Sequence, residues 1–199
     1  MRAGAFLDRD GVVNIDHGYV FRKEDFQFVA GTLEAARLLK ELGFALVIVT
    51  NQAGIARGMY SVADFQTLTD WMRAEFASNG AALDGVYYCP HHPTEGSPPY
   101  RQLCRCRKPQ AGLLLDAARD LDIDLGRSVL FGDKASDLQA GSAAGVPQRV
   151  LLGKDGHEVP EDPAPAGLAT ARYRSLQAAL KDPSMRIRLA RCAAEQVDR

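Results

Sequence analysis

Near its start the chain reads Ala3-Gly4-Ala5-Phe6-Leu7-Asp8-Arg9-Asp10-Gly11, an apolar run followed directly by two acidic residues. Such a run predicts a buried strand that ends in a polar loop, because strands covered on both faces read as continuous apolar segments. The segment 44–49 repeats the pattern, with six apolar residues before Thr50 and Asn51. We therefore expect two buried strands with polar side chains at their ends.

Outward from these two runs, predicted helices and strands alternate. Apolar residues at helical spacing predict a helix that Thr32 caps and Gly43 ends, and a second helix that Ser61 caps and Gly80 ends. Further strands are predicted at 85–88, 128–131 and 148–152, and further helices at 112–121, 136–144 and 176–181. This alternation predicts an α/β fold, a three-layer, Rossmann-like open parallel sheet with helices on both faces.

The composition indicates one folded domain with no nucleic-acid or membrane partner. The 199 residues are 46% apolar and 25% charged, which is enough apolar material for a core. The 24 Lys and Arg residues balance 25 Asp and Glu residues, so the net charge of -1 gives no general attraction to polyanions. The chain has no apolar run near the roughly 20 residues of a membrane span. Because Asp8 interrupts any signal-peptide core, we expect a cytoplasmic protein.

Polar residues that can carry chemistry follow three of the predicted strands. They are Asp8, Asp10, Thr50, Asn51, Asp133 and Lys134. Ligands of open parallel sheets bind at the carboxyl ends of strands, so we expect these residues to converge on one crevice. Crowded carboxylates suit Mg²⁺, which commonly binds substrate phosphate as well. In such a site one carboxylate can attack phosphorus while a second moves the proton of the leaving group.

Four motifs in chain order resemble those of the haloacid dehalogenase superfamily of phosphatases. They are Asp8-Arg9-Asp10-Gly11, Thr50-Asn51, Arg107-Lys108-Pro109 and Gly132-Asp133 followed by Asp137. Within that superfamily, the segments 6–11, 16–19, 50–58, 88–93 and 104–109 are similar to those of the heptose bisphosphate phosphatases, and the resemblance covers about residues 1–180. It implies a Mg²⁺-dependent enzyme that removes the C7 phosphate of the sugar through an aspartyl-phosphate, in the synthesis of ADP- or GDP-heptose precursors.

The resemblance also implies roles for individual residues. Asp8 would be the nucleophile and Asp10 the general acid and base, with Mg²⁺ on Asp8, Asp133 and the backbone carbonyl of Asp10. Thr50, Asn51 and Lys108 would hold the phosphoryl group, so the catalytic set is Asp8, Asp10, Thr50 and Lys108. Residues expected to bind substrate are Asp16, His17, Gly18, Tyr19, Asn51, Gln52, Ala53, Arg57, Arg107 and Lys134.

Two of these assignments carry a reservation. Ala53 stands where the family more often has Ser, so only backbone contacts are expected there. For Arg57, contact with a second phosphate and simple solvation are equal alternatives.

Three of the four cysteines cluster as Cys89-x-His91, twelve intervening residues and Cys104-x-Cys106. Three thiolates and one imidazole suit a tetrahedral structural Zn²⁺ site, and free thiols are the alternative. The neighbouring His92 is an alternative to His91, which the family pattern favours. The loop 89–106 is rich in proline and poor in apolar residues, so we expect the metal to fold it and to hold Arg107 and Lys108 in place.

Rival functions differ in how much of this pattern they explain. A histidinol-phosphate phosphatase shares all four motifs and the zinc loop, and the segment 16–19 favours the heptose substrate over it. A phospho-receiver signalling domain does not explain the order of the motifs, because its phosphorylated Asp follows a later strand than its first acidic pair. A zinc-containing nucleic-acid module is disfavoured by the net charge of -1.

The spacing of the motifs leaves no room for a large cap domain. We expect a capless phosphatase domain over 1–181 and a helical tail over 182–199. The expected partner is a small sugar phosphate, and the expected state is a monomer.

Overall fold

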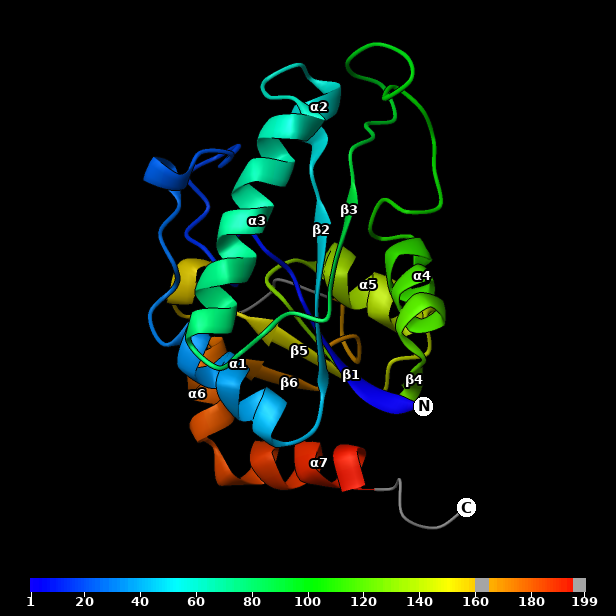
Figure 1. Cartoon of the computed structure of the whole chain (residues 1–199). Coiled ribbons are helices and arrows are strands. Elements are labelled where there is room, and N and C mark those ends of the chain that lie inside the picture. The colour runs from blue at the N-terminus through cyan, green and yellow to red at the C-terminus, as the bar shows by residue number, and fades with distance from the viewer. Residues whose placement is uncertain (160–164, 195–199) are drawn as a thin grey trace.

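The computed structural model describes residues 1–159 and 165–194, which contain a sheet of six parallel strands (Figure 1). The strands are β1 (Arg2–Leu7), β2 (Ala45–Asn51), β3 (Gly85–Cys89), β4 (Ile123–Gly132), β5 (Gln148–Leu152) and β6 (Ala171–Tyr173). They lie in the order β3-β2-β1-β4-β5-β6. The predicted open parallel sheet is confirmed.

Helices cover both faces of this sheet (Figure 1). One face carries α1 (Thr32–Glu41), α3 (Val62–Ser78), α6 (Leu176–Lys181) and α7 (Pro183–Ala194), and the other carries α4 (Gly112–Leu121) and α5 (Ala135–Ala143). Successive side chains of a strand point to opposite faces, so Leu7 lies in one hydrophobic core and Phe6 in the other. The three-layer prediction is therefore confirmed.

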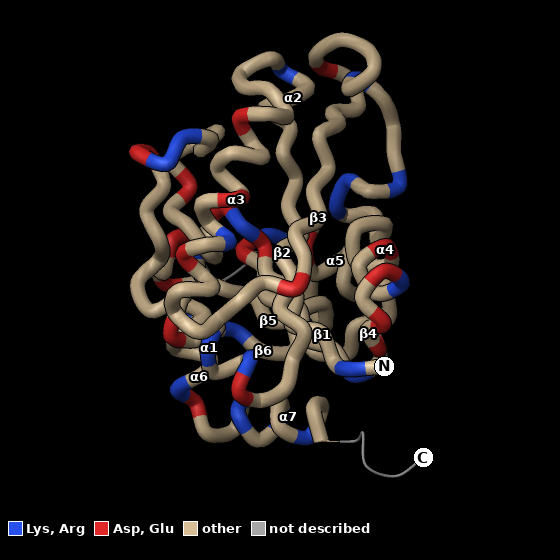
Figure 2. Tube along the Cα trace, in the orientation of Figure 1, with Lys and Arg blue, Asp and Glu red and all other residues tan. Residues whose placement is uncertain are grey.

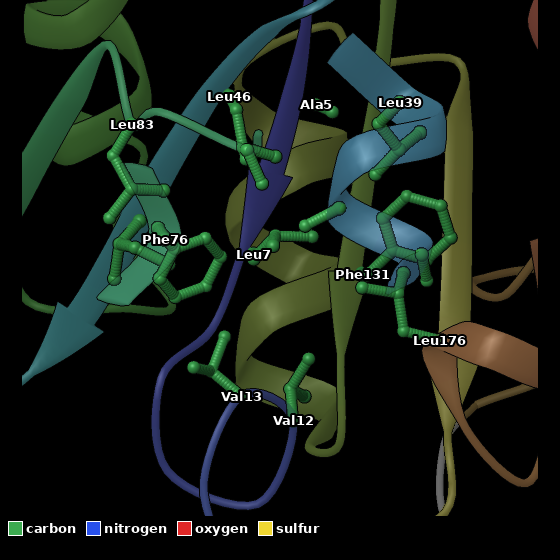
Figure 3. Packing of buried hydrophobic residues seen from close by; sticks show 14 of the residues in the cluster. Ala5, Leu7, Val12, Val13, Leu39, Leu46, Phe76, Leu83, Phe131 and Leu176 are labelled. Atoms are coloured by element: carbon green, nitrogen blue, oxygen red, sulfur yellow. The ribbon is translucent and has the colours of Figure 1, made fainter. Parts of the chain in front are cut away.

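Figure 3 shows the core on the side of α1 and α3. Leu7, Leu46 and Phe131 come from three neighbouring strands and are fully buried. Val12 and Val13, from the loop after β1, point into the same core and are buried as well (Figure 3). Because burying such a side chain stabilises the fold by roughly 1.5–3 kcal/mol, the core anchors both sides of the polar segment 8–11.

The strand order reverses at β1. The chain runs from β1 to β2 and β3 on one side and then returns to β4 on the other side of β1. Connections that leave in opposite directions open a crevice at the carboxyl ends of the strands. Asp8 directly follows β1, Asn51 ends β2 and Asp133 directly follows β4, so the topology brings the three motifs to this crevice.

Three local features differ from the sequence pattern. Thr32 is the first residue of α1 and not its cap, because Gly31 takes the cap position with a φ of 77° and the Thr32 hydroxyl donates to the Val12 carbonyl at 3.3 Å. The strand predicted at 128–131 begins earlier, at Ile123, which pairs with Arg2. The loop after β2 contains a short helix, α2 (Ala53–Ala56).

The C-terminal helix α7 is packed on the sheet. Met185 and Leu189 are fully buried in the same core as α1, and the Arg127 guanidinium donates to the carbonyl oxygens of Cys192 (3.0 Å) and Ala193 (2.9 Å). Residues 195–199 of the predicted tail lie outside the described residues, as does the segment 160–164. The division of the chain between residues 181 and 182 stays a prediction.

The crevice has no large cap domain among the described residues. Between β1 and β2 the chain forms only loops, the 3₁₀ helix η1 (Lys23–Asp25) and α1; between β2 and β3 it forms α2 and α3. Basic and acidic residues are interspersed along the trace (Figure 2). In the described parts of the chain, we find no helix that combines the length and the apolar character of a membrane span.

Candidate active site

Asp8 and Lys108 form a buried ion pair at the end of β1. Lys108 Nζ lies 2.9 Å from Asp8 Oδ1 and 2.7 Å from Asp137 Oδ1, and it donates to the carbonyl oxygen of Val49 at 2.8 Å. Burial raises the pKa of the Asp8 carboxyl, although the charge of Lys108 opposes this. Burial alone would lower the pKa of Lys108, but the charges of Asp137 and Asp8 outweigh it and raise that pKa. Lys108 is therefore a fixed positive charge beside Asp8.

Asp133 completes a cluster of three carboxylates with Asp8 and Asp137, whose ligand oxygens lie within 4.8 Å of one another. Both carboxylate oxygens of Asp133 are buried and accept no hydrogen bond from the described residues. Burial, with the negative charge of Asp8, raises the pKa of Asp133 to about 7. Lys134 Nζ lies 3.6 Å from Asp133 Oδ2, so three carboxylates face two ammonium groups. Buried carboxylate oxygens without hydrogen bonds are costly, so the cluster fits a divalent cation such as Mg²⁺.

Asp137 orients the groups around this cluster. Its Oδ1 faces Lys108, and its Oδ2 accepts a hydrogen bond from the backbone N–H of Lys134 at 3.0 Å. Because both oxygens of Asp137 already face donors, Asp133 and Asp8 are the better-suited cation ligands. Gly11 lets the chain pass close to Asp133: its φ is 92°, and a Cβ there would lie 2.5 Å from Asp133 Oδ2.

Asp10 is held by side chains from several directions. Arg9 Nη2 donates to its two oxygens at 2.9 and 3.1 Å, Asn14 Nδ2 donates to Oδ1 at 3.1 Å, and Gln52 Nε2 donates to Oδ2 at 2.9 Å. The Arg9 side chain is only 1% exposed, and its Nη2 also donates to the carbonyl oxygen of Val20 at 2.7 Å. Arg9 thereby connects Asp10 to the loop that follows β1.

Thr50 and Asn51, at the end of β2, have different partners. Thr50 Oγ1 accepts a hydrogen bond from Gln52 Nε2 at 2.8 Å. Asn51 Nδ2 donates to the backbone carbonyl of Lys108 at 3.1 Å, and Asn51 Oδ1 accepts from the backbone N–H of Lys108 at 3.0 Å. The amide of Asn51 therefore fixes the segment that carries Lys108.

A cavity of about 320 Å³ opens beside these residues. It is lined by Asp10, Asp16, Gly18, Tyr19, Asn51, Gln52, Ala53, Gly54, Tyr60 and Lys134. Most of the residues that the sequence assigns to substrate binding are thus brought together here. His17 lines a second cavity of about 490 Å³, which shares Gly18 and Tyr19 with the first, and Arg57 and Arg107 line neither.

Two lysines hold Asp16 at the mouth of the cavity. Lys154 Nζ lies 3.3 Å and Lys134 Nζ lies 4.0 Å from Asp16 Oδ2. Asp155 Oδ1 accepts a hydrogen bond from the backbone N–H of Asp16 at 2.7 Å. Burial alone would raise the pKa of Asp16, but the hydrogen bond from Gly18 and the charges of both lysines lower it. Lys154 and Asp155 belong to the 3₁₀ helix η2 (Lys154–Gly156), which the sequence did not single out.

Arg57 connects the loop over the cavity to the cysteine loop. Its Nε lies 2.8 Å from Glu95 Oε2, and its guanidinium contacts the hydroxyl of Tyr19. The Arg57 side chain is thus engaged with protein groups on both sides, and its contact with a second phosphate stays a prediction.

The cysteine loop brings four metal-ligand atoms together. Cys89 Sγ lies 3.5 Å from Cys104 Sγ and 3.3 Å from Cys106 Sγ, and His91 Nδ1 lies 3.4 Å from Cys106 Sγ. Zn–S bonds of about 2.3 Å in a tetrahedron place sulfur atoms about 3.8 Å apart, so this set fits Zn²⁺. The cysteines form no disulfide. His92 has other partners, because its Nδ1 accepts from the backbone N–H of Glu95 at 3.0 Å.

The same loop leads directly to Lys108. Arg107 Nη1 donates to the carbonyl oxygen of His91 at 3.2 Å. The side-chain amide of Asn51 makes two hydrogen bonds with the backbone of Lys108. The cysteine cluster and β2 thus hold the segment 107–108 from two sides. Figure 1 shows this loop rising beside α2 at the carboxyl ends of β2 and β3.

Sequence reasoning missed two buried residues of the site. Arg9 stands between Asp8 and Asp10, directly after a buried strand. Because both neighbours were predicted to face the crevice, the sequence could have indicated that Arg9 also belongs to the site. Tyr60, by contrast, gives no local signal. Its hydroxyl donates to Gln52 Oε1 at 2.5 Å, and burial raises its pKa to about 12.

A parallel sheet with an Asp-x-Asp motif after β1, a threonine at the end of β2 and a buried lysine beside the first aspartate of the motif defines a hydrolase of the haloacid dehalogenase class. Residues 105–176 match the HAD-hydrolase-like family model. The chain belongs to the family of the D-glycero-β-D-manno-heptose-1,7-bisphosphate 7-phosphatases, as its similarity to named members shows.

Three of these relatives illustrate the similarity. The Photorhabdus laumondii phosphatase of that name is 53% identical over 147 residues, which are 74% of this chain and 78% of the relative. The Escherichia coli K12 phosphatase is 52% identical over 147 residues, covering 74% and 77%. The crystal structure of the B. bronchiseptica D,D-heptose 1,7-bisphosphate phosphatase, complexed with magnesium and phosphate, has a TM-score of 0.73 and 32% identity over 89% of this chain and 96% of that one.

Proposed function

We propose that this chain is a Mg²⁺-dependent phosphatase that removes the C7 phosphate of D-glycero-β-D-manno-heptose 1,7-bisphosphate. One observation carries the proposal: the buried carboxylate of Asp8 lies beside Lys108 and Asp133 at the carboxyl end of the central strand. The names of the relatives support the choice of substrate. The histidinol-phosphate alternative has no comparable support among the relatives that we compare.

In the first step, a carboxylate oxygen of Asp8 attacks phosphorus. The bond between Asp8 and phosphorus forms while the bond between phosphorus and the C7 oxygen breaks, and Asp10 gives its proton to the leaving oxygen. Arg9 and Gln52 hold the Asp10 carboxyl during this transfer. The charge of Lys108 and the hydroxyl of Thr50 stabilise the non-bridging oxygens.

In the second step, water attacks the phosphorus of the aspartyl-phosphate. The Asp10 carboxylate takes a proton from this water, the bond between Asp8 and phosphorus breaks, and inorganic phosphate leaves. Asp8 and Asp10 return to their starting states, so the same pair serves both half-reactions.

Mg²⁺ would be held by Asp8, Asp133 and the backbone carbonyl of Asp10, and it supplies positive charge that offsets the crowded carboxylates and the substrate phosphate. Asp137 keeps Lys108 in place beside this site. Zn²⁺ would be held by Cys89, His91, Cys104 and Cys106 and has a structural role, because four protein ligands leave no open position.

The rest of the substrate would occupy the cavity of about 320 Å³. The loop residues Asp16, His17, Gly18 and Tyr19, the β2-end residues Asn51, Gln52 and Ala53, and Arg57, Arg107 and Lys134 would surround the sugar and its second phosphate. A cavity of this size suits one free sugar phosphate. We also propose that the protein is a cytoplasmic monomer with no nucleic-acid or membrane partner.

The test compares phosphate release from both anomers of the heptose bisphosphate and from histidinol phosphate. We expect kcat/KM to favour the β anomer over histidinol phosphate by about a hundredfold or more, because a polar site rejects ligands that leave its groups unpaired. Phosphorus NMR of the product should show heptose 1-phosphate. A preference for histidinol phosphate, or release of the C1 phosphate, would contradict the proposal.

A further inference from the structure

Tyr60, Gln52 and Asp10 form a continuous chain of hydrogen bonds that ends in the site. The Tyr60 hydroxyl donates to Gln52 Oε1 at 2.5 Å, and Gln52 Nε2 donates both to Asp10 Oδ2 at 2.9 Å and to Thr50 Oγ1 at 2.8 Å. Tyr60 is 7% exposed and Gln52 is 1% exposed. Both the oxygen and the NH₂ group of the Gln52 amide are therefore hydrogen-bonded to other side chains.

The direction of this amide matters because its two ends differ chemically. Arg9 Nη2 donates to both oxygens of Asp10, so Asp10 is the acceptor in this network and the NH₂ end of Gln52 faces it. The Oε1 end is then buried and needs a donor, which the hydroxyl of Tyr60 provides. Without that donor the buried oxygen loses its partner, and a flipped amide would turn its oxygen toward the carboxylate.

The ring of Tyr60 is itself fixed by close packing. It stacks on Phe21 with ring centroids 5.1 Å apart and an interplanar angle of 11°. It also lies against Gly54, where any Cβ would collide with the tyrosine ring. The hydroxyl is therefore held at one position relative to Gln52.

Asp10 receives a second restraint on its other side from Arg9, whose Nη2 contacts both carboxylate oxygens. Arg9 remains when Tyr60 is changed, so losing the tyrosine hydroxyl should impair Asp10 and Thr50 without removing them. A partial loss of rate is the expected consequence.

We infer that Tyr60 is a positioning residue for phosphoryl transfer: through Gln52 it orients the carboxyl of Asp10 and the hydroxyl of Thr50. This inference rests on the proposed function, in which Asp10 protonates the leaving oxygen. It assigns no contact between Tyr60 and the reacting phosphate.

The test is Tyr60→Phe, which keeps the ring and removes only the hydroxyl. We expect kcat on the heptose bisphosphate to fall about tenfold with KM nearly unchanged, because misplaced acid–base groups cost part of their 10²–10⁴-fold contribution. With 4-nitrophenyl phosphate, whose leaving group needs no proton, the pre-steady-state burst of 4-nitrophenol measures the attack by Asp8 alone. Its rate should fall by no more than about threefold, because only the effect through Thr50 remains in that step. Tyr88→Phe removes a hydroxyl from the same aromatic cluster and serves as the matched control.

A second measurement tests the route through Gln52. In a double-mutant cycle, Tyr60→Phe should have little further effect in a Gln52→Met background, because the connecting amide is already absent. Equal losses on both substrates, an unchanged rate, or additive effects in the cycle would overturn the inference. Wild-type turnover of the heptose substrate tests the proposed function separately, and any alkyl phosphate that the wild type hydrolyses can replace it in this comparison.

Discussion

The ammonium nitrogen of Lys108 lies 2.9 Å from Oδ1 of Asp8, and both side chains are buried. One residue follows the first strand and the other follows the cysteine loop, so the ion pair joins two distant parts of the chain. In the proposed function, it places a permanent positive charge beside the phosphate that Asp8 attacks.

Replacement of Lys108 by Met should destabilise the fold. Removing one partner from a buried charge group leaves Asp8 and Asp137 facing each other, which typically costs about 3–5 kcal/mol. Urea unfolding at pH 8 measures this change. Lys134→Met, whose side chain is 52% exposed, is the control and should cost less than about 1 kcal/mol. Equal losses in the free energy of unfolding for the two variants would show that the buried ion pair stabilises the fold no more than an exposed one.

Asp10→Asn should abolish most turnover while substrate binding survives. The amide fills the same space but cannot give or take the proton, so kcat should fall by about 10²–10⁴. Calorimetry should give a dissociation constant for substrate within about threefold of that of the wild type. Wild-type turnover in this variant would show that the proton is moved by another group.

Removal of zinc should lower activity through the position of Lys108. The loop that holds the cysteine cluster also carries Arg107, which donates to the carbonyl oxygen of His91. A chelator titration with Mg²⁺ kept saturating should reduce kcat and zinc content in parallel, with recovery after zinc is restored. Cys192→Ser is the control: that cysteine lies outside the cluster, so the variant should keep the zinc content and the activity of the wild type. Full activity after complete zinc loss would refute this link.

Mg²⁺ affinity should weaken as the pH falls. In the cation-free protein the pKa of Asp133 is raised to about 7, so at pH 6 most Asp133 carboxyls hold a proton that the cation must displace. We expect about tenfold weaker binding at pH 6 than at pH 8, measured by calorimetry with the metal alone. Proton release on binding, found from the dependence on buffer ionisation enthalpy, should rise from about 0.1 proton at pH 8 to about 0.9 proton at pH 6. Affinity that is constant over this range would contradict the raised pKa.

Leu189→Ala should show that α7 belongs to the folded core. This side chain is fully buried, and truncation of a buried leucine costs about 2–5 kcal/mol. Thermal or urea unfolding measures the loss, while kcat should stay near that of the wild type, because α7 packs away from the crevice. Arg188→Ala, at an exposed position of the same helix, should change stability by less than about 0.5 kcal/mol. A cooperative unfolding curve of unchanged midpoint for Leu189→Ala would mean that α7 is a separate tail.

The sequence predicted the sheet well where the pattern is local. The runs before Asp8 and Thr50 became β1 and β2, and Ser61 caps α3 as predicted. The structure adds that Asp64 completes a capping box with Ser61. The first half of β4 escaped prediction because polar residues such as Asp124 and Arg127 interrupt it. That half is a strand because its backbone pairs with the start of β1.

The sequence by itself determined which residues are candidates for the chemistry: the acids after β1, the threonine at the end of β2, the lysine after the cysteine loop and the four proposed zinc-ligand positions. Apolar runs, cap residues and ligand spacings are properties of neighbouring residues, so they can be read along the chain.

Only the tertiary structure decided which partner each polar group takes. The amide of Asn51 grips the Lys108 backbone, and Tyr60 reaches Asp10 through Gln52. These hydrogen bonds join segments that the packing of helices on the sheet brings together, and a buried donor must find its acceptor there because water is excluded.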